Sequence, residues 1–377
     1  MRGSVQLGLA FGASVPLPAP PHVMEALEAV EIESGDEGRS GFQITFLVGR
    51  DRNAPRDYAL LEGPSLELFS RVRIWVAVDG RPEGLIDGFV TDRQLNPGEM
   101  PGTTTLTVTG EDVSVMMDLE ERSEEHPAQS VPVIVTKLIL RYKKYGLVPD
   151  LGRPGSLETP LPTDRIPVQQ GTDLEYLTEL AKAQGFVFFV EPGPVPGTNR
   201  AFWGPPDRVG VPQKPLTVNM GPYTNVSEVD FRENGLAATR VTGEVQDRST
   251  NRSSTVDTPV STRPPLSSRP AWLRQSHVRV RRLRESGIDL NRAREKAQAI
   301  LDDSVDEVVT ASGRLDVASY GAVLRPRRLV SLRGAGHSHN GLYYVKRVSH
   351  SLSRGSYTQG FTLARDGTGS LVPTVAL

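Results

Sequence analysis

A segment of the chain occurs twice, first at residues 71–112 and again, 255 residues later, at 326–367. Each copy predicts three β-strands joined by two turns, and the strand order and loop lengths agree without a gap. The aligned apolar pairs are Ile74/Leu329, Trp75/Val330, Phe89/Tyr344, Val90/Val345, Leu106/Phe361 and Val108/Leu363. Identities are few, so the alternation of apolar and polar residues alone could produce part of the match. An internal repeat constrains the whole fold, and we therefore predict a duplicated β unit.

Composition fits a β-rich protein with many loops. The 377 residues include 36 Gly and 30 Pro, and this length suggests two or three domains. The 43 Lys and Arg nearly balance the 45 Asp and Glu, so no overall field attracts nucleic acid or a membrane. Cysteine is absent, which excludes disulfides and thiolate metal sites and suits assembly in a reducing compartment. No apolar run approaches the roughly 20 residues of a transmembrane helix, so we expect no membrane insertion.

We predict a mainly β protein with α insertions, an α+β fold in three parts. Residues 1–118 are expected to form a first β-barrel domain, 119–215 an α/β middle domain with linkers, and 216–377 a second, similar β-barrel domain. The second barrel is expected to carry an exposed, mobile loop at 249–269, where Ser, Thr, Pro and Arg dominate. A helix is predicted at 290–303, where apolar residues recur at helical spacing.

The clearest local signal is a helix in the middle part. Thr172 is predicted to cap it, and Glu175 completes a capping box three residues later. The apolar stripe comprises Leu174, Leu177, Leu180 and Ala181. Gly185 is predicted to end the helix in the left-handed conformation, and an aromatic strand follows from Phe186.

Motifs of common enzymes are missing from the sequence. It contains no Gly-Lys-Ser/Thr phosphate loop, no Gly-x-Ser-x-Gly elbow and no His-Glu-x-x-His helix. The acidic residues at 120–125 could be an acid–base pair, but a solvated connector is preferred. We therefore expect no enzymatic activity and no cofactor.

Two further clusters are candidate binding sites. His337 and His339 could ligate a metal, but they lie in a Gly-rich turn without a nearby carboxylate, so a solvated loop is preferred. Arg279 and Arg281 alternate with valines along one face of a predicted strand. A nucleic-acid surface would need interleaved aromatic residues, so a charged lumen or a seam between subunits is preferred.

The middle helix and the closing strands resemble the late-control D family. This family comprises baseplate hub proteins of contractile phage tails and of phage-tail-like injection systems, and type VI secretion spike proteins are related to it. The resemblance covers nearly the whole chain, most strongly at 168–191 and 320–366. The residues that carry it are Thr172, Asp173, Leu177, Leu180, Ala181, Gly185, Phe186, Gly341, Val345, His350 and Phe361.

The resemblance implies a structural role. Such hubs carry two similar barrels per chain and form homotrimers, so six barrels make a ring that matches a hexameric tail tube or tube initiator protein. A separate trimeric spike protein would bind the other side, with a tape measure or cargo as further partners. Assembly would take place in the bacterial cytoplasm, before incorporation into a phage virion baseplate or a contractile injection particle.

Contacts of this kind need exposed sheet edges and broad faces rather than reactive groups. We expect six residues of the two repeat copies in or near the subunit, tube or spike contacts, namely Arg73, Trp75, His337, His339, Tyr343 and Tyr344. For the two tyrosines, simple burial in the core is an equal alternative. Two other functions stay open, a carbohydrate- or receptor-binding tail module and a cell-wall hydrolase component.

Overall fold

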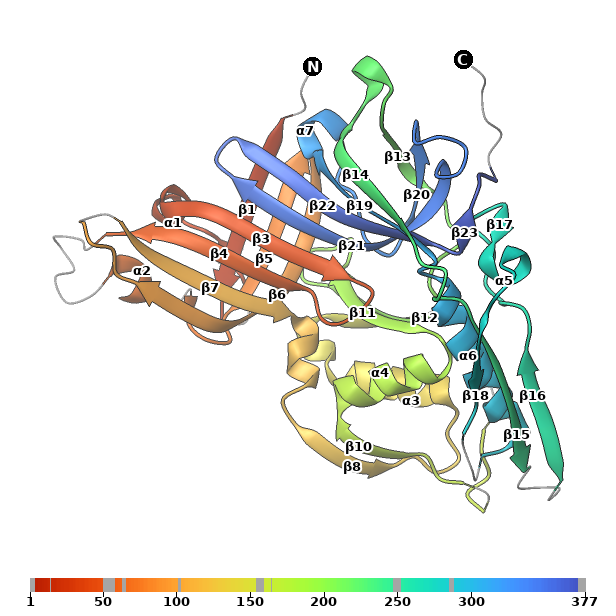
Figure 1. Ribbon diagram of the computed structural model, residues 1–377. Coiled ribbons are helices and arrows are strands. Elements are labelled where there is room, and N and C mark those ends of the chain that lie inside the picture. The colour runs from red at the N-terminus through yellow and green to blue at the C-terminus, as the bar shows by residue number, and fades with distance from the viewer. Residues whose placement is uncertain are drawn as a thin grey trace.

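The computed structural model of this chain is built mainly from β-strands, with few helices (Figure 1). It describes residues 4–13, 15–49, 58–62, 66–100, 103–153, 159–163, 165–246, 252–284 and 288–371. The predicted α+β class with a predominance of β structure is confirmed.

The helices and strands follow one another in three groups. The first comprises β1 (Val5–Gly12), β2 (Leu17–Pro18), α1 (Pro21–Ala26), β3 (Leu27–Gly35), β4 (Gly41–Val48), α2 (Ala59–Glu62), β5 (Arg71–Val78), β6 (Arg81–Asn96), β7 (Thr104–Asp112) and the short 3-10 helix η2 (Val113–Met117). The second comprises β8 (Glu121–Glu125), α3 (Val131–Arg141), η3 (Lys143–Tyr145), β9 (Leu147–Leu151), β10 (Val168–Thr172), α4 (Asp173–Ala183), β11 (Val187–Pro192) and β12 (Asn199–Gly204). The third comprises β13 (Gln213–Thr217), η4 (Gly221–Tyr223), β14 (Val226–Glu233), β15 (Thr239–Gln246), β16 (Ser253–Thr258), β17 (Arg269–Pro270), α5 (Ala271–Arg274), β18 (Arg279–Arg282), α6 (Leu290–Val305), β19 (Val309–Asp316), α7 (Val317–Tyr320), β20 (Leu329–Arg333), β21 (Gly341–Ser353), β22 (Ser356–Arg365) and β23 (Gly367–Thr368).

Strand β4 shows how sequence alternation makes the sheet. Phe42, Ile44 and Phe46 are buried, while Gln43 between them is exposed. Successive side chains of a strand point to opposite faces, so one face of β4 packs on the core and the other meets solvent. Each buried apolar side chain of this kind contributes about 1.5–3 kcal/mol.

The two repeat copies fold into the same three-stranded antiparallel meander. The first copy is β5-β6-β7 and the second is β20-β21-β22. A β-bulge interrupts β6 between Val90 and Asp92, and one interrupts β21 between Val345 and Arg347, at the aligned positions of the two copies. Bulges bend a strand and increase its twist, so the matched bulges give both meanders a similar curvature.

The loop lengths of the two copies differ, contrary to the prediction. Val78 pairs with Arg81 across the first turn of copy one, whereas Leu332 pairs with Gly341 across the corresponding turn of copy two. The second turn is instead tighter in copy two, where Ser353 pairs with Ser356. An ungapped alignment hides these differences, because alternating apolar residues still match when a strand slips by two positions.

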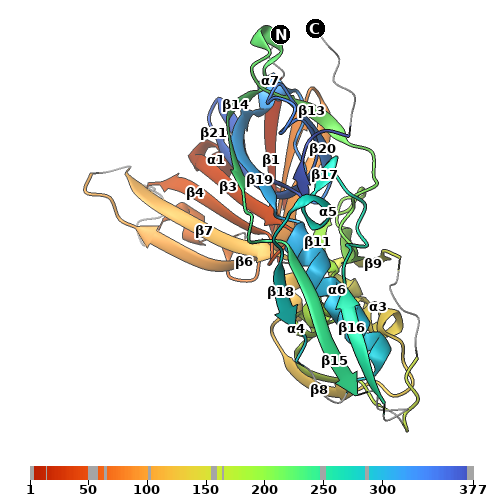
Figure 2. The same cartoon turned by 45° about the vertical axis from the view of Figure 1, so that its right-hand side comes forward.

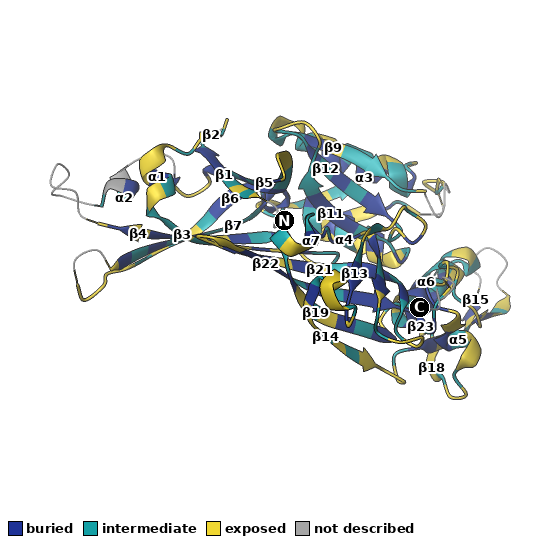
Figure 3. Cartoon of the chain, turned by 90° about the horizontal axis from the view of Figure 1, so that it is seen from above, coloured by how far each residue is buried: buried dark blue, intermediate teal, exposed yellow. Residues whose placement is uncertain are grey.

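The first and third groups of elements form the first and second halves of the chain, on either side of the middle group. Their strands join into one 13-stranded sheet (Figures 1 and 3). Its order is β14-β19-β22-β21-β3-β4-β7-β6-β5-β1-β2, and β20 pairs with both β13 and β21. The halves meet where β21 pairs with β3, from Arg347 opposite Gly35 to Ser353 opposite Ala29. The 13 residues of β21 extend beyond the 5 of β20, which leaves an edge free for β3. Two similar β-barrel domains were expected, and the pairing of β21 with β3 joins their strands into one sheet. The proposed domain boundaries stay a prediction.

The middle group has its own core. Helices α3 and α4 lie between the β8–β10 pair and the sheet β11-β12-β9 (Figure 1). The predicted capping box is confirmed, because the Glu175 N–H donates to Thr172 Oγ1 at 3.2 Å and the Thr172 N–H donates to Glu175 Oε2 at 2.9 Å. Gly185 follows the helix at φ +66°, in the predicted left-handed conformation. The acidic segment predicted as a solvated connector is instead strand β8, which pairs with β10.

An arm made of β15, β16, β18 and α6 extends away from the large sheet (Figure 2). The exposed loop predicted at 249–269 contains a strand, since residues 253–258 form β16, whereas residues 259–268 have no helix or strand; residues 249–251 lie outside the described part. Val256 of β16 packs with Ala293 and Ala297 of α6. A strand with only one buried face needs few apolar residues, so the polar composition of β16 resembles that of a loop. The helix predicted at 290–303 is confirmed as α6.

None of the helices in the described ranges has the length and apolarity needed to span a bilayer.

Candidate functional site

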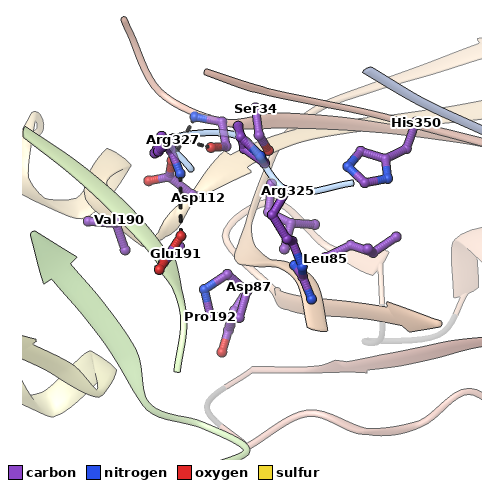
Figure 4. A pocket seen from close by; sticks show the side chains of 13 residues that line it. Ser34, Leu85, Asp87, Asp112, Val190, Glu191, Pro192, Arg325, Arg327 and His350 are labelled. Carbon is purple, nitrogen blue, oxygen red and sulfur yellow. Dashed lines mark hydrogen bonds and ion pairs between the residues drawn. The ribbon is translucent and has the colours of Figure 1, made fainter. Parts of the chain in front are cut away.

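A small cavity lies where the three groups of elements meet (Figure 4). The central residue of this cavity is Arg327. The Nε of Arg327 donates to the Gly35 carbonyl of β3 at 2.7 Å. The guanidinium of Arg327 lies 4.0 Å from the centre of the Phe189 ring of β11. Nη1 also approaches Glu191 at 3.9 Å. The side chain is only 4% exposed, and burial lowers its pKa while Glu191 and Asp112 oppose that shift. One buried cation therefore connects the second half to the first half and to the middle group.

Two more arginines hold the same junction. Arg71 of β5 forms a bidentate pair with Asp87 of β6, at 2.7 and 3.0 Å, and donates to the Tyr145 carbonyl at 2.9 Å. Arg325 reaches from the second half to Glu83 of β6, with Nη2 to Oε2 at 2.7 Å. Bidentate arginine pairs fix geometry as well as charge. The contacts of Arg71 and Arg325 therefore hold the first half against the middle group and against the second half.

The remaining polar groups of the cavity are also engaged. The Asp112 carboxylate accepts from the backbone N–H groups of Ser40 at 2.7 Å and Ser114 at 2.9 Å. His350 bonds to the Tyr357 hydroxyl at 2.7 Å, and burial lowers the pKa of His350 to about 3, so the ring is neutral. The cavity measures about 20 Å³, which is room for about one water molecule. It is a structural junction and not a substrate pocket.

The fold matches solved structures of phage tail proteins over nearly the whole chain. A tail protein from Neisseria meningitidis superposes with a TM-score of 0.66 at 15% identity, covering 96% of this chain and 97% of that one. The 43 kDa tail protein of prophage MuSo2 from Shewanella oneidensis gives 0.65 at 13% identity, covering 97% and 100%. This chain has a phage-tail-protein fold.

A third similar structure belongs to a secretion system. The Escherichia coli c3393 protein, a type VI secretion system component with structural similarity to the phage T4 tail proteins gp27 and gp5, gives a TM-score of 0.55 at 14% identity. The match covers 93% of this chain and 78% of that one. No family model and no curated protein matches the sequence. At these identities the likeness establishes the fold alone.

The tail-protein fold places the two predicted interface tyrosines inside the chain. Tyr343 is 0% exposed and its hydroxyl donates to the His339 carbonyl at 2.8 Å, while Tyr344 is 5% exposed and packs with Leu266 and Leu329. Both rings are thus buried in the single chain, which agrees with the core alternative, and a position near a partner contact stays a prediction. Alternation could not decide this, because β21 is largely covered on both faces at this point.

The other predicted interface residues are partly accessible. Trp75 lies over Gly8 of β1, where an added Cβ would come within 2.1 Å of the indole ring. Arg73 lies 3.5 Å from Asp87. His339 is half-buried and stacks on Phe231 with ring centres 4.4 Å apart, and His337 is exposed. No group of three or more metal-ligating side chains occurs in the described part of the chain.

The family-motif residues serve the core and the backbone. Asp173 is 0% exposed and accepts from Arg141 at 3.0 Å, from Tyr142 at 2.9 Å and from Gln169 at 2.7 Å. Leu177, Ala181, Val345, His350 and Phe361 are buried, Leu180 and Phe186 pack partly buried against the middle core, and Gly341 has φ +127°. Their spacing therefore reflects packing and turns rather than chemistry.

Sequence reasoning missed an apolar surface on the third group. Leu236 is 70% exposed and Leu273 is 64% exposed. Leu236 lies in the turn after β14 and Leu273 in α5, and these two segments are joined because Gln275 Nε2 donates to the Gly235 carbonyl. Exposed apolar patches mark interaction sites when several side chains gather. Single leucines give no such signal in a sequence, since only the fold brings them together.

Proposed function

We propose that this chain is a structural hub in the baseplate of a contractile phage tail or of a related injection particle. The observation that carries the proposal is the repeated meander with matched bulges at Thr91 and Lys346, set in one continuous sheet. The phage-tail-protein fold supports it. The arginine junction supports a rigid body, because its charged groups are paired inside the chain.

Three copies would present six similar β units, which suits stacking on a hexameric tail tube or tube initiator. The opposite side would keep threefold symmetry for a separate trimeric spike. A closed ring needs a heterologous contact, in which two different surfaces of the chain meet between neighbouring copies. Tape measure or cargo proteins are further proposed partners, and assembly in the bacterial cytoplasm precedes incorporation into the particle.

The proposed contacts lie on the accessible parts of the two halves. Arg73 and Trp75 are half-buried on the first half, and the turn with His337 and His339 projects from the second. The patch formed by Leu236 and Leu273 adds the apolar area that a stable contact needs, and we call it the leucine patch.

We propose a non-enzymatic role. The carboxylates of the junction are paired or bonded to backbone N–H groups, which does not suit a cell-wall hydrolase with two free carboxylates in a cleft. The tryptophans do not support a carbohydrate groove, since Trp203 is fully buried and Trp75 packs on Gly8.

Mass measurement of the purified chain under native conditions tests the proposal. We expect a species of three copies at micromolar concentration. A monomer at all concentrations, together with glycan binding on an array, would instead support the receptor-binding alternative.

A further inference from the structure

A larger cleft, of about 440 Å³, lies between α4, β11, the turn after β3 and two segments, one before β13 with Arg208 and one after β16 with Arg263. It continues into an open hollow of about 670 Å³ along α4, which shares Thr178 and Lys182 with the cleft. The apolar lining of the cleft includes Phe186, Phe188 and Phe189. We call it the β11 cleft.

Strand β11 forms one wall and has a free edge. Among the strands that the structure describes, it pairs with β12 alone, in the order β11-β12-β9. The Trp203 carbonyl of β12 accepts from Gly152 N–H on the β9 side, at 3.0 Å, so this carbonyl points away from β11. Phe188 lies opposite Trp203 and is therefore in a non-hydrogen-bonded pair, with its N–H and C=O turned to the free edge. Val190 lies opposite Ala201, two residues further along, so its N–H and C=O also point to the free edge.

These backbone groups are buried without partners. Phe188 is 9% exposed and Val190 is 2% exposed. Within the described ranges, no group forms a hydrogen bond with the outward N–H or C=O of either residue. A buried backbone group without a partner is unfavourable, so such a wall favours a ligand that supplies matching donors and acceptors.

The floor of the cleft carries unpaired side-chain groups as well. Tyr344 is 5% exposed and Arg208 is 6% exposed, and neither the tyrosine hydroxyl nor Arg208 Nε has a partner among the described residues. Burial raises the pKa of Tyr344 well above its usual value, with a smaller contribution from Asp36, so the hydroxyl stays a donor. Asp36 also lines the cleft, and its carboxyl group supplies an acceptor.

The charged groups of the cleft are mostly paired with one another. Arg263 pairs with Asp303 at 2.7 Å and with Asp306, and Lys346 pairs with Glu37 at 2.9 Å and with Glu307. A charged ligand would have to displace these ion pairs. A neutral ligand would not, and its apolar parts could pack against the phenylalanines.

We propose that the β11 cleft binds an extended, uncharged segment of a partner protein, which adds a strand to the free edge of β11. An extended backbone presents N–H donors and C=O acceptors in alternation, and these can pair with the outward C=O and N–H groups of Phe188 and Val190. Apolar side chains at every second position would contact the aromatic lining, and a carboxamide or peptide group would bond with Tyr344 and Asp36. This inference goes beyond the hub role and does not depend on it.

Hydrogen exchange of the purified chain gives the first test. The Phe188 and Val190 amides should exchange faster than those of Phe189 and Glu191, whose N–H groups face β12. Equal protection of all four amides in the dilute chain would overturn the proposal. Protection of Phe188 and Val190 that rises with chain concentration would also overturn it, because a second copy would then fill the edge.

Peptide binding gives the second test. The probe is an array of acetylated and amidated decapeptides that spans charged, polar and apolar sequences. The best binders should be uncharged, alternate apolar residues and slow exchange at Phe188 and Val190. Thr178→Arg should weaken them at least about tenfold by blocking the cleft, and Tyr344→Phe about fivefold by removing the hydroxyl.

A matched control is available on the other helix. Thr136 of α3 and Thr178 of α4 both donate to the carbonyl four residues earlier, at 2.8 Å, but only Thr178 lines the cleft. Thr136→Arg should therefore leave peptide binding unchanged. Equal binding by wild type and Thr178→Arg, or no peptide bound by the wild type, would overturn the proposal whether or not the chain forms trimers.

Discussion

The guanidinium of Arg327 stacks on Phe189, with 4.0 Å between its carbon and the ring centre. The two residues come from the second half and from the middle group, and Arg327 also bonds to the Gly35 carbonyl of the first half. Their contact therefore fixes three parts of the chain against one another.

Arg327→Met should destabilise the chain by about 3 kcal/mol, measured by urea unfolding. The substitution keeps most of the side-chain volume but removes the donor to the buried Gly35 carbonyl and the cation that stacks on Phe189, and losing one side of such a buried charged contact costs this much. The control is Arg314→Met, since Arg314 is 63% exposed and lies 3.8 Å from Glu228. Its effect should stay below about 0.5 kcal/mol. A loss at Arg327 no larger than at Arg314 would contradict the role of the junction.

Asp36→Asn should stabilise the chain increasingly as the pH rises from about 4 to about 6, with the full gain above pH 6. Burial raises the pKa of Asp36 from 3.8 to about 6, partly offset by Lys346. The folded chain thus holds this proton more tightly than the unfolded chain, and the stability from Asp36 is full below about pH 4 and is lost as the pH rises through 6.

Asparagine stays neutral, so the gain should be about 1–2 kcal/mol at pH 7.5 and near zero at pH 4, measured by thermal unfolding at both pH values. Glu33→Gln is the control, because Glu33 is 59% exposed and paired with Arg347. An equal effect of Asp36→Asn at both pH values would mean that the carboxyl group is not buried as described.

Thr172→Ala should cost about 1–2 kcal/mol of unfolding free energy. It removes the acceptor for the Glu175 N–H and the hydroxyl that donates to Asp118 at 2.7 Å. Thr172→Ser keeps the hydroxyl and should recover most of the loss. If serine and alanine variants unfold alike in urea, the cap does not hold this helix.

Local patterns in the sequence predicted local structure well. The alternation in β4 and the capping box of Thr172 and Glu175 depend on neighbours a few residues apart, and both are confirmed. The turn lengths of the repeat and the pairing of β21 with β3 depend on residues far apart in sequence. A period of two fixes which face is buried but not the register, so these features could not be predicted.

The site was harder to predict than the fold. Tyr343 and Tyr344 were expected at an interface, but strand β21 is covered on both faces by elements distant in sequence. Residues 253–258 were predicted as an exposed loop but form strand β16. Only one face of this strand is buried, so its sequence contains few apolar residues. Both outcomes arise because burial depends on tertiary contacts rather than on composition.

Leu273→Asp should weaken self-association of the proposed hub by about tenfold or more. Leu273 and Leu236 are both largely exposed in the single chain, so a contact between copies would bury them and a carboxylate would have to lose its hydration there. Because Leu273 is 64% exposed, its replacement should change unfolding free energy by no more than about 0.5 kcal/mol. Sedimentation over a range of concentrations gives the association constant, and Leu161→Asp, at a residue 63% exposed in another part of the chain, is the matched control. If the two aspartate variants associate as well as the wild type, the leucine patch is not the contact between copies, and another exposed surface must form it.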